Sequence, residues 1–155
     1  MIIHKPLPGV SRPALARFTE RARRAVRLPG KVNVVLAANG EVRELNRRYR
    51  GKDSATDVLS FPPIPTVADD FGGDIIVASD VAAANARRFG HDAQHEIKIL
   101  ILHALLHLAG YDHEVDDGRM ARREQRLRRE LGLASGLIER ANGATRPGEK
   151  RRRQR

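Results

Sequence analysis

The order of hydrophobic and polar residues along the chain predicts helices and strands that alternate. Apolar residues spaced three and four apart are typical of one helix face, whereas short β-branched runs bounded by Gly or Pro are typical of strands. Helices are expected at 11–28, 39–50, 80–89, 92–109 and 115–131. Strands are expected at 31–37, 57–61 and 73–78, with a short additional strand at 2–3.

This order of elements predicts an α+β fold. A small mixed β-sheet of about four strands is expected to pack with the helices, because each apolar helix face must be covered. A doubly wound fold with only parallel strands would need more strands than the pattern offers. The length of 155 residues suits a single domain. We expect that domain at 1–144, followed by a basic disordered tail at 145–155.

The composition limits the chemistry that the chain can carry. Hydrophobic residues make up 41% and charged residues 31% of the chain, which is typical of a globular protein and excludes collagen-like and low-complexity chains. The sequence contains no Cys, so a disulfide framework, a thiolate nucleophile and a Cys-ligated metal site are excluded. Any bound metal must therefore be held by His and carboxylate side chains.

The charge favours a polyanionic partner. Lys and Arg number 29 against 19 acidic residues, and the formal net charge is +10. Arg matches phosphate bidentately, so the 24 arginines indicate nucleic acid, although a GC-rich genome also raises the Arg content. The basic helix face at 119–130 and the tail at 145–155 either lie along RNA or are solvated surfaces.

Nothing in the sequence predicts a membrane protein. The segment 1–10 lacks the apolar run of a signal peptide, and the longest apolar run, at 99–109, is about half a membrane span. We expect a cytoplasmic protein with no membrane partner.

Two histidines interrupt the most apolar helix of the chain. The segment 97–109 is apolar nearly all round, so we expect it to be the most buried helix. Its His103 and His107 are four residues apart, which on a helix means about 40° of rotation, so both imidazoles can converge on one ion. A reversal at Gly110 can bring His113 back to the same ion. Three nitrogen ligands with one open position are typical of a catalytic zinc.

The same histidine spacing occurs a second time and provides a comparison. His91 and His95 lie in a polar stretch with no Gly turn and no third His, so we interpret them as surface residues or as outer partners of a site. The alternative for His103 and His107 is a pair of buried imidazoles that bond to backbone carbonyls. The glycine and the third histidine favour a metal site.

The ligand pattern also resembles that of zinc peptidases. The skeleton H-E-x-x-H-x-x-G-x-x-H is matched at His103, His107, Gly110 and His113. Those peptidases use the Glu after the first His as a general base, whereas Ala104 carries no proton. Peptide hydrolysis by the usual route is therefore disfavoured.

The stretch at 103–113, HALLHLAGYDH, resembles the signature of the YbeY family of bacterial ribosomal RNA maturation factors. Members of this family are single-strand-specific, metal-dependent endoribonucleases. Three further stretches resemble the family in order and spacing, at 45–53, 56–62 and 73–75, so the resemblance covers about 32–129. Ala104 stands where many members have Gly, and the Arg-rich tail lies outside the resemblance.

The resemblance implies one zinc ion per chain, held by His103, His107 and His113, in a site that nickel or copper could also occupy. It implies cleavage of ribosomal RNA, notably at the 3′ end of the small-subunit RNA, and action on defective ribosomes. The implied partners are the small ribosomal subunit and ribosomal proteins or assembly factors. The family's functional arginine corresponds to Arg50, which could grip the scissile phosphate while the metal acts as a Lewis acid or hydroxide source. Without the resemblance, a solvated residue after a helix end is the favoured interpretation of Arg50.

Two alternatives remain open from the sequence: a zinc peptidase-like hydrolase, and a non-catalytic ribosome-assembly factor with structural zinc. An open coordination position would favour an enzyme, because structural zinc is normally closed by four protein ligands. Asp112 and Glu114 could orient an imidazole, although Asp112 equally suits a cap of the following turn. Asp57 is interpreted as a residue that orders a loop. Tyr49 and Tyr111 could stack on a base, although packing beside the site is the favoured interpretation.

Overall fold

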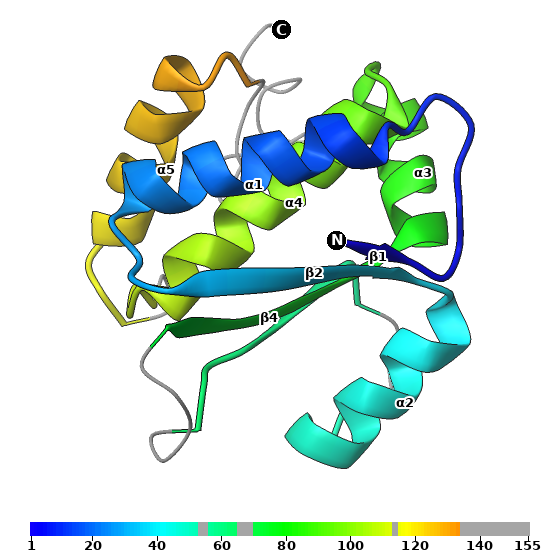
Figure 1. The fold of residues 1–155 in the computed structure, drawn as a ribbon, viewed down its shortest axis with the longest axis horizontal. Helices are drawn as coiled ribbons and strands as arrows, with labels where there is room; N and C mark the ends of the chain where they lie inside the picture. Colours follow the sequence, from blue (N-terminus) through cyan, green and yellow to red (C-terminus); the bar gives the residue numbers. More distant parts are fainter. Residues whose placement is uncertain (53–55, 65–69, 113–114, 134–155) are drawn as a thin grey trace, which may run out of the picture.

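The computed structural model describes residues 1–52, 56–64, 70–112 and 115–133, which form a sheet with helices on both faces (Figure 1). The strands are β1 (Ile2–Ile3), β2 (Lys31–Ala37), β3 (Val58–Phe61) and β4 (Phe71–Ala78). The helices are α1 (Arg12–Val26), α2 (Asn39–Arg50), α3 (Ser79–Phe89), α4 (Ala93–Leu108) and α5 (Arg119–Glu130). Each helix and strand that the pattern predicted is present.

The sheet has the strand order β1-β2-β4-β3. β2 runs parallel to both β1 and β4, whereas β3 runs antiparallel to β4 at one edge. Because a hairpin cannot join parallel neighbours, the chain leaves β2 through α2 and β3 before it returns as β4. The mixed sheet of four strands confirms the predicted α+β fold.

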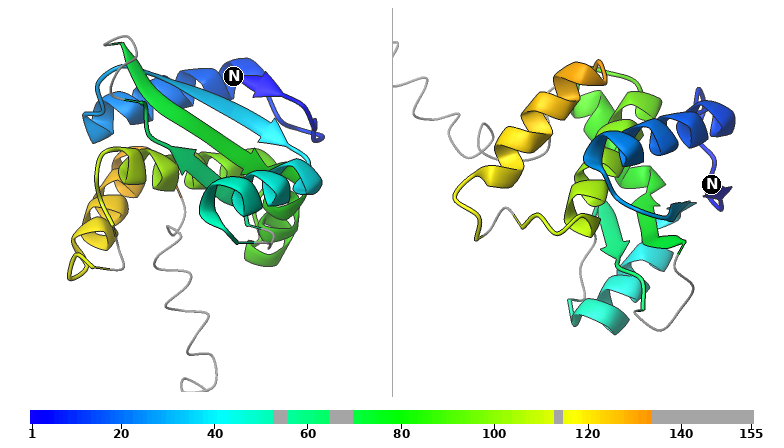
Figure 2. Two further views of the ribbon diagram at one scale, coloured as in Figure 1. Left: turned by 90° about the horizontal axis from the view of Figure 1, so that it is seen from below. Right: turned by 60° about the vertical axis from the view of Figure 1, so that its left-hand side comes forward.

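The two faces of the sheet carry separate hydrophobic cores. Side chains alternate along a strand, so Val34 of β2 and Ile75 of β4 enter the main core with α1 and α4. Their neighbours Val35 and Ile76 belong to a smaller core on the opposite face, where Val42 of α2 packs. Figure 2 shows α2 on that face of the sheet. Because both faces of the sheet are covered, residues 72, 73 and 75–78 of β4 are all buried.

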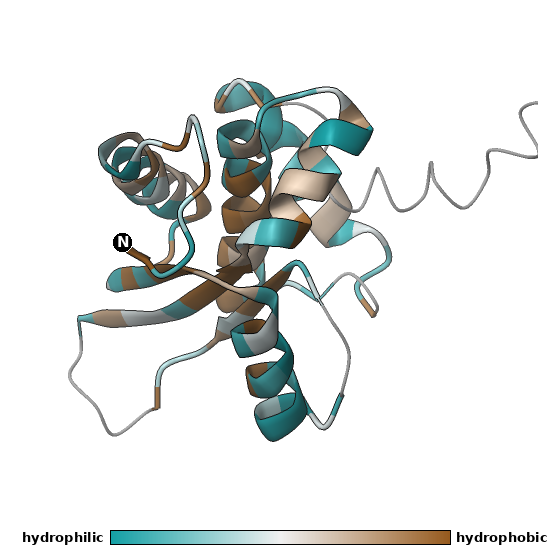
Figure 3. Ribbon diagram, turned by 90° about the vertical axis from the view of Figure 1, so that its right-hand side faces the viewer, coloured by the Kyte–Doolittle hydropathy of each residue, from teal (hydrophilic) through white to brown (hydrophobic). Residues whose placement is uncertain are grey.

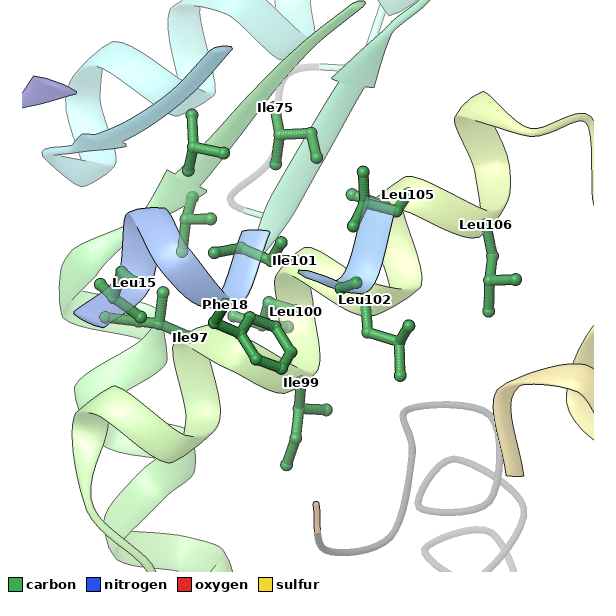
Figure 4. Close-up of a cluster of buried hydrophobic side chains, with 14 of the residues drawn as sticks. Leu15, Phe18, Ile75, Ile97, Ile99, Leu100, Ile101, Leu102, Leu105 and Leu106 are labelled. Carbon is green, nitrogen blue, oxygen red and sulfur yellow. The ribbon is translucent and has the colours of Figure 1, made fainter. Parts of the chain in front are cut away.

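α4 is buried on nearly all sides, as its apolar pattern predicted. Its residues 96, 97 and 99–106 are buried, and α1, α3, α5 and the sheet pack around it (Figure 3). In Figure 4, Ile101 points toward Ile75 of the sheet, whereas Ile99 and Leu102 leave the opposite side of the helix. Dense packing on every side restricts the rotation of this helix, which gives any side chain on it a well-defined position.

The start of α5 differs from the prediction. The pattern predicted a helix from 115, but the helix begins at Arg119. Asp116 accepts hydrogen bonds from the backbone N–H groups of Gly118 at 3.1 Å and Met120 at 2.8 Å, and Gly118 has a φ of 82°. A residue with positive φ cannot continue a right-handed helix, so the chain turns before α5 begins.

Other boundaries also depend on tertiary contacts. β4 begins at Phe71 rather than at 73, because Phe71 pairs with Lys31 of β2. The predicted tail at 145–155 and the domain boundary before it lie outside the described residues. Across the described residues, no helix is both long and apolar enough to cross a membrane.

Candidate active site

A pocket of about 520 Å³ opens where α4, β3 and the end of α2 meet. Arg50 of α2 and the two histidines of α4 line it together, although they are far apart in the sequence. The complete lining is Tyr49, Arg50, Thr56, Asp57, Val58, Ser60, Phe61, His103, Ala104, His107 and Asp112. The structure therefore brings three of the four predicted site residues to one pocket.

His103 and His107 face each other on the side of the pocket that α4 forms. Their Nε2 atoms are 3.1 Å apart, and their ring centroids are 4.8 Å apart. His103 is buried, whereas His107 is half-buried toward the pocket. The predicted convergence of two imidazoles one helical turn apart is present.

Each imidazole has an acceptor at its other ring nitrogen. Nδ1 of His107 donates to the backbone carbonyl of Tyr111 at 3.1 Å. Nδ1 of His103 lies 3.4 Å from Oε2 of Glu124, a buried carboxylate on α5. A carbonyl and a carboxylate only accept hydrogen bonds, so both Nδ1 atoms carry the ring proton. Both Nε2 lone pairs therefore converge, which requires a cation or a proton between them.

This arrangement fits two ligands of a zinc ion. Two nitrogens bound to tetrahedral zinc at about 2.0–2.1 Å lie about 3.3 Å apart, close to the 3.1 Å observed here. Acceptors at the outer nitrogen of each imidazole are also typical of zinc-bound histidine. Without a metal ion, the two facing Nε2 atoms would have to share a proton instead.

The third predicted ligand cannot be placed. His113 and its neighbour Glu114 lie outside the described residues, so the role of each stays a prediction. Among the described residues, no group of three or more His, Cys, Asp or Glu side chains is arranged to hold a metal ion.

The chain reverses after α4, as predicted for Gly110. This residue has a φ of 96°, and its N–H donates to the carbonyl of His107 at 3.0 Å. The N–H of Tyr111 donates to the carbonyl of Leu106 at 3.1 Å. The same turn brings the Tyr111 carbonyl onto His107, so the glycine helps to orient a candidate ligand.

Arg50 occupies the last turn of α2 and is exposed at the rim of the pocket. Gly51 ends the helix there with a φ of 68°, and its N–H donates to the carbonyl of Arg47 at 3.2 Å. Because glycine adopts this left-handed conformation without strain, the chain can leave α2 directly after the arginine. The guanidinium is therefore accessible to an anion in the pocket.

Two further residues of the site were not recognised from the sequence. Asp57, interpreted as a loop-ordering residue, lines the pocket. Burial raises the pKa of its carboxyl, while the charge of His103 and the backbone N–H groups of Asp57 and Val58 act in the opposite direction. Glu124 looked like one of many charges on a basic helix, and its only sequence signal is that it lies one helical turn after the apolar Met120.

The second histidine pair has a different role. Nε2 of His91 lies 2.8 Å from Oε1 of Glu96, which is fully buried and also accepts from Asn85 at 3.4 Å. His91 is therefore a partly buried partner of a core carboxylate and not a surface residue. Burial and the neighbouring His91 lower the pKa of His95. Neither ring lines the pocket.

Comparisons with known proteins identify the family of this chain. The family model described as Endoribonuclease YbeY matches residues 10–132. An Endoribonuclease YbeY from Koribacter versatilis is 47% identical over 153 residues, covering 99% of both chains. One from Solibacter usitatus is 48% identical, covering 83% of this chain and 85% of that protein.

A solved structure is also similar to this chain. The solution structure of a Thermotoga maritima protein is similar with a TM-score of 0.57 and 29% identity, covering 96% of this chain and 93% of that one. This similarity extends over almost the whole of both chains, and the family match covers the pocket, the histidine helix and α5. The chain therefore belongs to the YbeY endoribonuclease family.

Proposed function

We propose that this protein is a zinc-dependent endoribonuclease that cleaves single-stranded RNA during the maturation of ribosomal RNA. Its substrate is the 3′ end of the small-subunit RNA, and it also acts on defective ribosomes. The small ribosomal subunit and its assembly factors are its partners, and the cytoplasm is its place of action. The observation that carries the proposal is the pocket that Arg50, His103 and His107 line together in a chain of this family.

In this proposal His103, His107 and His113 hold one zinc ion. A bound zinc ion supplies Lewis-acid chemistry to a phosphodiester in the pocket. Glu124 and the Tyr111 carbonyl keep both ring protons on the outer nitrogens, so that each Nε2 stays available toward the pocket.

Arg50 binds the scissile phosphate. Its planar guanidinium can donate two parallel hydrogen bonds to phosphate oxygens and offset the charge that develops on them. The net charge of +10 favours the approach of RNA to this pocket.

Asp57 and Asp112 are the pocket carboxylates among the described residues. Burial raises the pKa of the Asp57 carboxyl, which makes it a better proton acceptor than an exposed aspartate. RNA supplies its own 2′-hydroxyl, so a strong protein base is not required for cleavage.

The chemistry of the pocket favours this proposal over the two alternatives. Ala104 lines the pocket at the position where zinc peptidases carry their general base, and a methyl group cannot move a proton. A structural zinc would not need an accessible pocket of about 520 Å³ beside its ligands.

The test is a cleavage assay with the full chain loaded with zinc and again after chelation. Substrates are a single-stranded oligonucleotide of the small-subunit RNA 3′ end, the same sequence in a duplex, and casein. We expect cleavage of the single strand alone, lost on chelation and restored by zinc. Zinc-loaded protein that cuts no RNA would contradict the proposal, and cleavage of casein would support the peptidase.

A further inference from the structure

A second groove of about 530 Å³ continues from the candidate active site along the outer face of the sheet. The two hollows share Tyr49 and Phe61, so a ligand can extend from one into the other. The groove is mainly apolar, with Leu45, Ile64 and Phe71 among its lining residues.

The surface of this groove is unusual because large apolar side chains are exposed there. Tyr49 is 65% exposed and Ile64 is 67% exposed. The Tyr49 and Phe61 rings meet edge to face, with centroids 5.6 Å apart and planes at 72°. The contact holds the Tyr49 ring in place at the groove while most of its surface stays accessible. Tyr49 therefore packs beside the site, as expected, and in addition presents most of its ring to the groove.

Positive charge lies at the rim of the groove and negative charge in its interior. Arg50 follows Tyr49 directly at the rim of the active-site pocket, and the Arg48 guanidinium lies 5.9 Å from the Tyr49 ring centroid. Inside the groove, Asp74 contributes a carboxylate, which accepts from Asn33 at 3.3 Å. Phosphate is therefore attracted to the rim and repelled from the interior of the groove.

We propose that this groove binds an unpaired nucleobase of the RNA strand whose phosphate lies at Arg50. The inference rests on the proposed function and adds a subsite to it. The base stacks on Tyr49, because every nucleobase presents an aromatic face and such stacking tolerates any sequence. Asp74 accepts a hydrogen bond from an amino or imino group on the edge of the base.

This subsite provides a physical reason for a single-strand requirement. In a duplex both faces of a base are covered by its neighbours and its edge is paired. Such a base can neither stack on Tyr49 nor reach Asp74. Selection for single strands then takes place at the groove, beside the reacting phosphate.

A second copy of the chain suits the groove less well. α2 carries Arg43, Arg47, Arg48 and Arg50, so a symmetric contact here would bring like charges together. Stable pairs of chains also bury about 1,200–2,000 Å², far more than one groove provides.

The experiment measures binding and cleavage separately. Full-length protein, with and without zinc, is titrated with a single-stranded RNA that carries 2-aminopurine at successive positions, and the dissociation constant and fluorescence quenching are recorded. Cleavage of the same RNA with an abasic ribose at each position gives KM and kcat. The variants are Tyr49→Ala, Tyr49→Phe and Phe89→Ala.

Phe89 provides a matched control. It also ends a helix, is 37% exposed, and has an arginine guanidinium 5.3 Å from its ring, but it does not line the groove. We expect Phe89→Ala to bind like the wild type. Because Tyr49 is mainly exposed, Tyr49→Ala is expected to fold, which its thermal unfolding curve checks.

We expect Tyr49→Ala to weaken RNA binding and to raise KM by about 5- to 100-fold, with little change in kcat. Tyr49→Phe keeps the ring and restores most of the affinity. An abasic ribose at one position should raise the KM of the wild type by a similar factor and leave the KM of Tyr49→Ala unchanged. The mutation and the abasic ribose remove the same stacking contact.

Unchanged binding and KM in Tyr49→Ala would overturn the inference. A wild-type dimer that Ile64→Ser converts to a monomer in sedimentation would assign the groove to a second copy and would also overturn it. Quenching that depends on Tyr49 in a protein that cuts no RNA would keep the subsite and contradict only the proposed activity.

Discussion

The carboxylate of Glu124 on α5 lies 3.4 Å from Nδ1 of His103 on α4, and only 2% of Glu124 is exposed. A buried carboxylate is costly unless it has partners, so this contact links the packing of α5 to the orientation of a candidate zinc ligand. A helix without pocket residues of its own thereby acts on the site.

Replacement of Glu124 is therefore expected to weaken zinc binding. Glu124→Ala should raise the dissociation constant for zinc about 10- to 100-fold, because the His103 ring loses the acceptor that fixes its proton and orientation. Glu124→Gln keeps an acceptor oxygen, so its dissociation constant for zinc should lie between those of the wild type and Glu124→Ala. Competition with a chromogenic chelator measures the constant, and Glu130→Ala, an exposed change on the same helix, is the control. Equal affinities in all variants would show that the contact is only structural.

Removal of a predicted ligand should remove the metal itself. His107→Ala is expected to reduce bound zinc from about one ion per chain to a small fraction, because Nε2 of His103 loses its facing partner. His113→Ala should have the same effect. Elemental analysis after dialysis checks both, with His95→Ala as the control outside the pocket. Full zinc content and activity in His113→Ala would exclude that residue from the site.

Arg50→Ala is expected to lower kcat/KM for RNA about 100-fold while zinc content stays unchanged. Arg50→Lys should recover only part of this loss, because an ammonium cannot match two phosphate oxygens at once. Arg87 lies in the last turn of α3, so Arg87→Ala is a matched control away from the pocket. Steady-state kinetics on the single-stranded substrate measure the effect. Similar losses in both variants would indicate general charge rather than a phosphate clamp.

Gly73 is expected to be intolerant of any side chain. Its φ is 130°, and an added Cβ would lie 2.7 Å from the Phe61 carbonyl oxygen and 2.8 Å from the Leu108 side chain. Gly73→Ala should lower the free energy of unfolding by about 1–3 kcal/mol. At Gly40 in α2 an added Cβ meets nothing within 4 Å, so Gly40→Ala should raise it by about 0.4–1 kcal/mol. Urea unfolding of the two variants measures both changes in the free energy of unfolding. Equal changes would contradict the close approach of Phe61 and Leu108 to Gly73.

The stability of α1 should depend on pH through Glu20. Arg23 donates to both carboxylate oxygens, at 2.9 Å and 2.5 Å, and this hydrogen bonding lowers the pKa of Glu20 from 4.5 to about 2. Since folding lowers this pKa, the contribution is complete above about pH 4.5 and is lost as the pH falls toward 2. The side chain is 43% exposed, so solvent screening limits the effect to about 0.5 kcal/mol.

Thermal unfolding of Glu20→Gln and of the wild type checks this prediction. The variant should be less stable at pH 7, and the difference should shrink steadily below about pH 4.5. A difference that is independent of pH would mean that the ion pair is not its source.

Asp57→Asn should separate stability from activity. A half-buried carboxylate costs folding free energy, so the amide should raise the unfolding free energy of the metal-free protein by about 1 kcal/mol. RNA cleavage should fall because the amide cannot accept a proton. Unfolding in the presence of a chelator and kinetics with zinc measure the two effects. A variant that is less stable and fully active would contradict the proposed role of Asp57 as a proton acceptor in the pocket.

The fold was predictable from the sequence to the extent that it depends on local signals. Helical spacing, β-branched runs and turn glycines act over a few residues, and α1, β2, α2 and α3 have the expected bounds to within a few residues. The bounds of β4 and α5 differ from the prediction, because one depends on pairing with a distant strand and the other on a specific turn. β4 is longer because Phe71 pairs with Lys31, and α5 begins later because Asp116 and Gly118 form a turn.

By itself, the sequence determined the elements, the mixed sheet and the facing pair His103 and His107, because both rings lie on a single helix whose geometry is known in advance. Only the tertiary structure decided which distant residues join them. Asp57 comes from a segment beside β3 and Glu124 from α5, and no periodicity in the chain encodes their approach to α4. The exposed ring of Tyr49 was decided in the same way, because exposure depends on how α2 packs on the sheet.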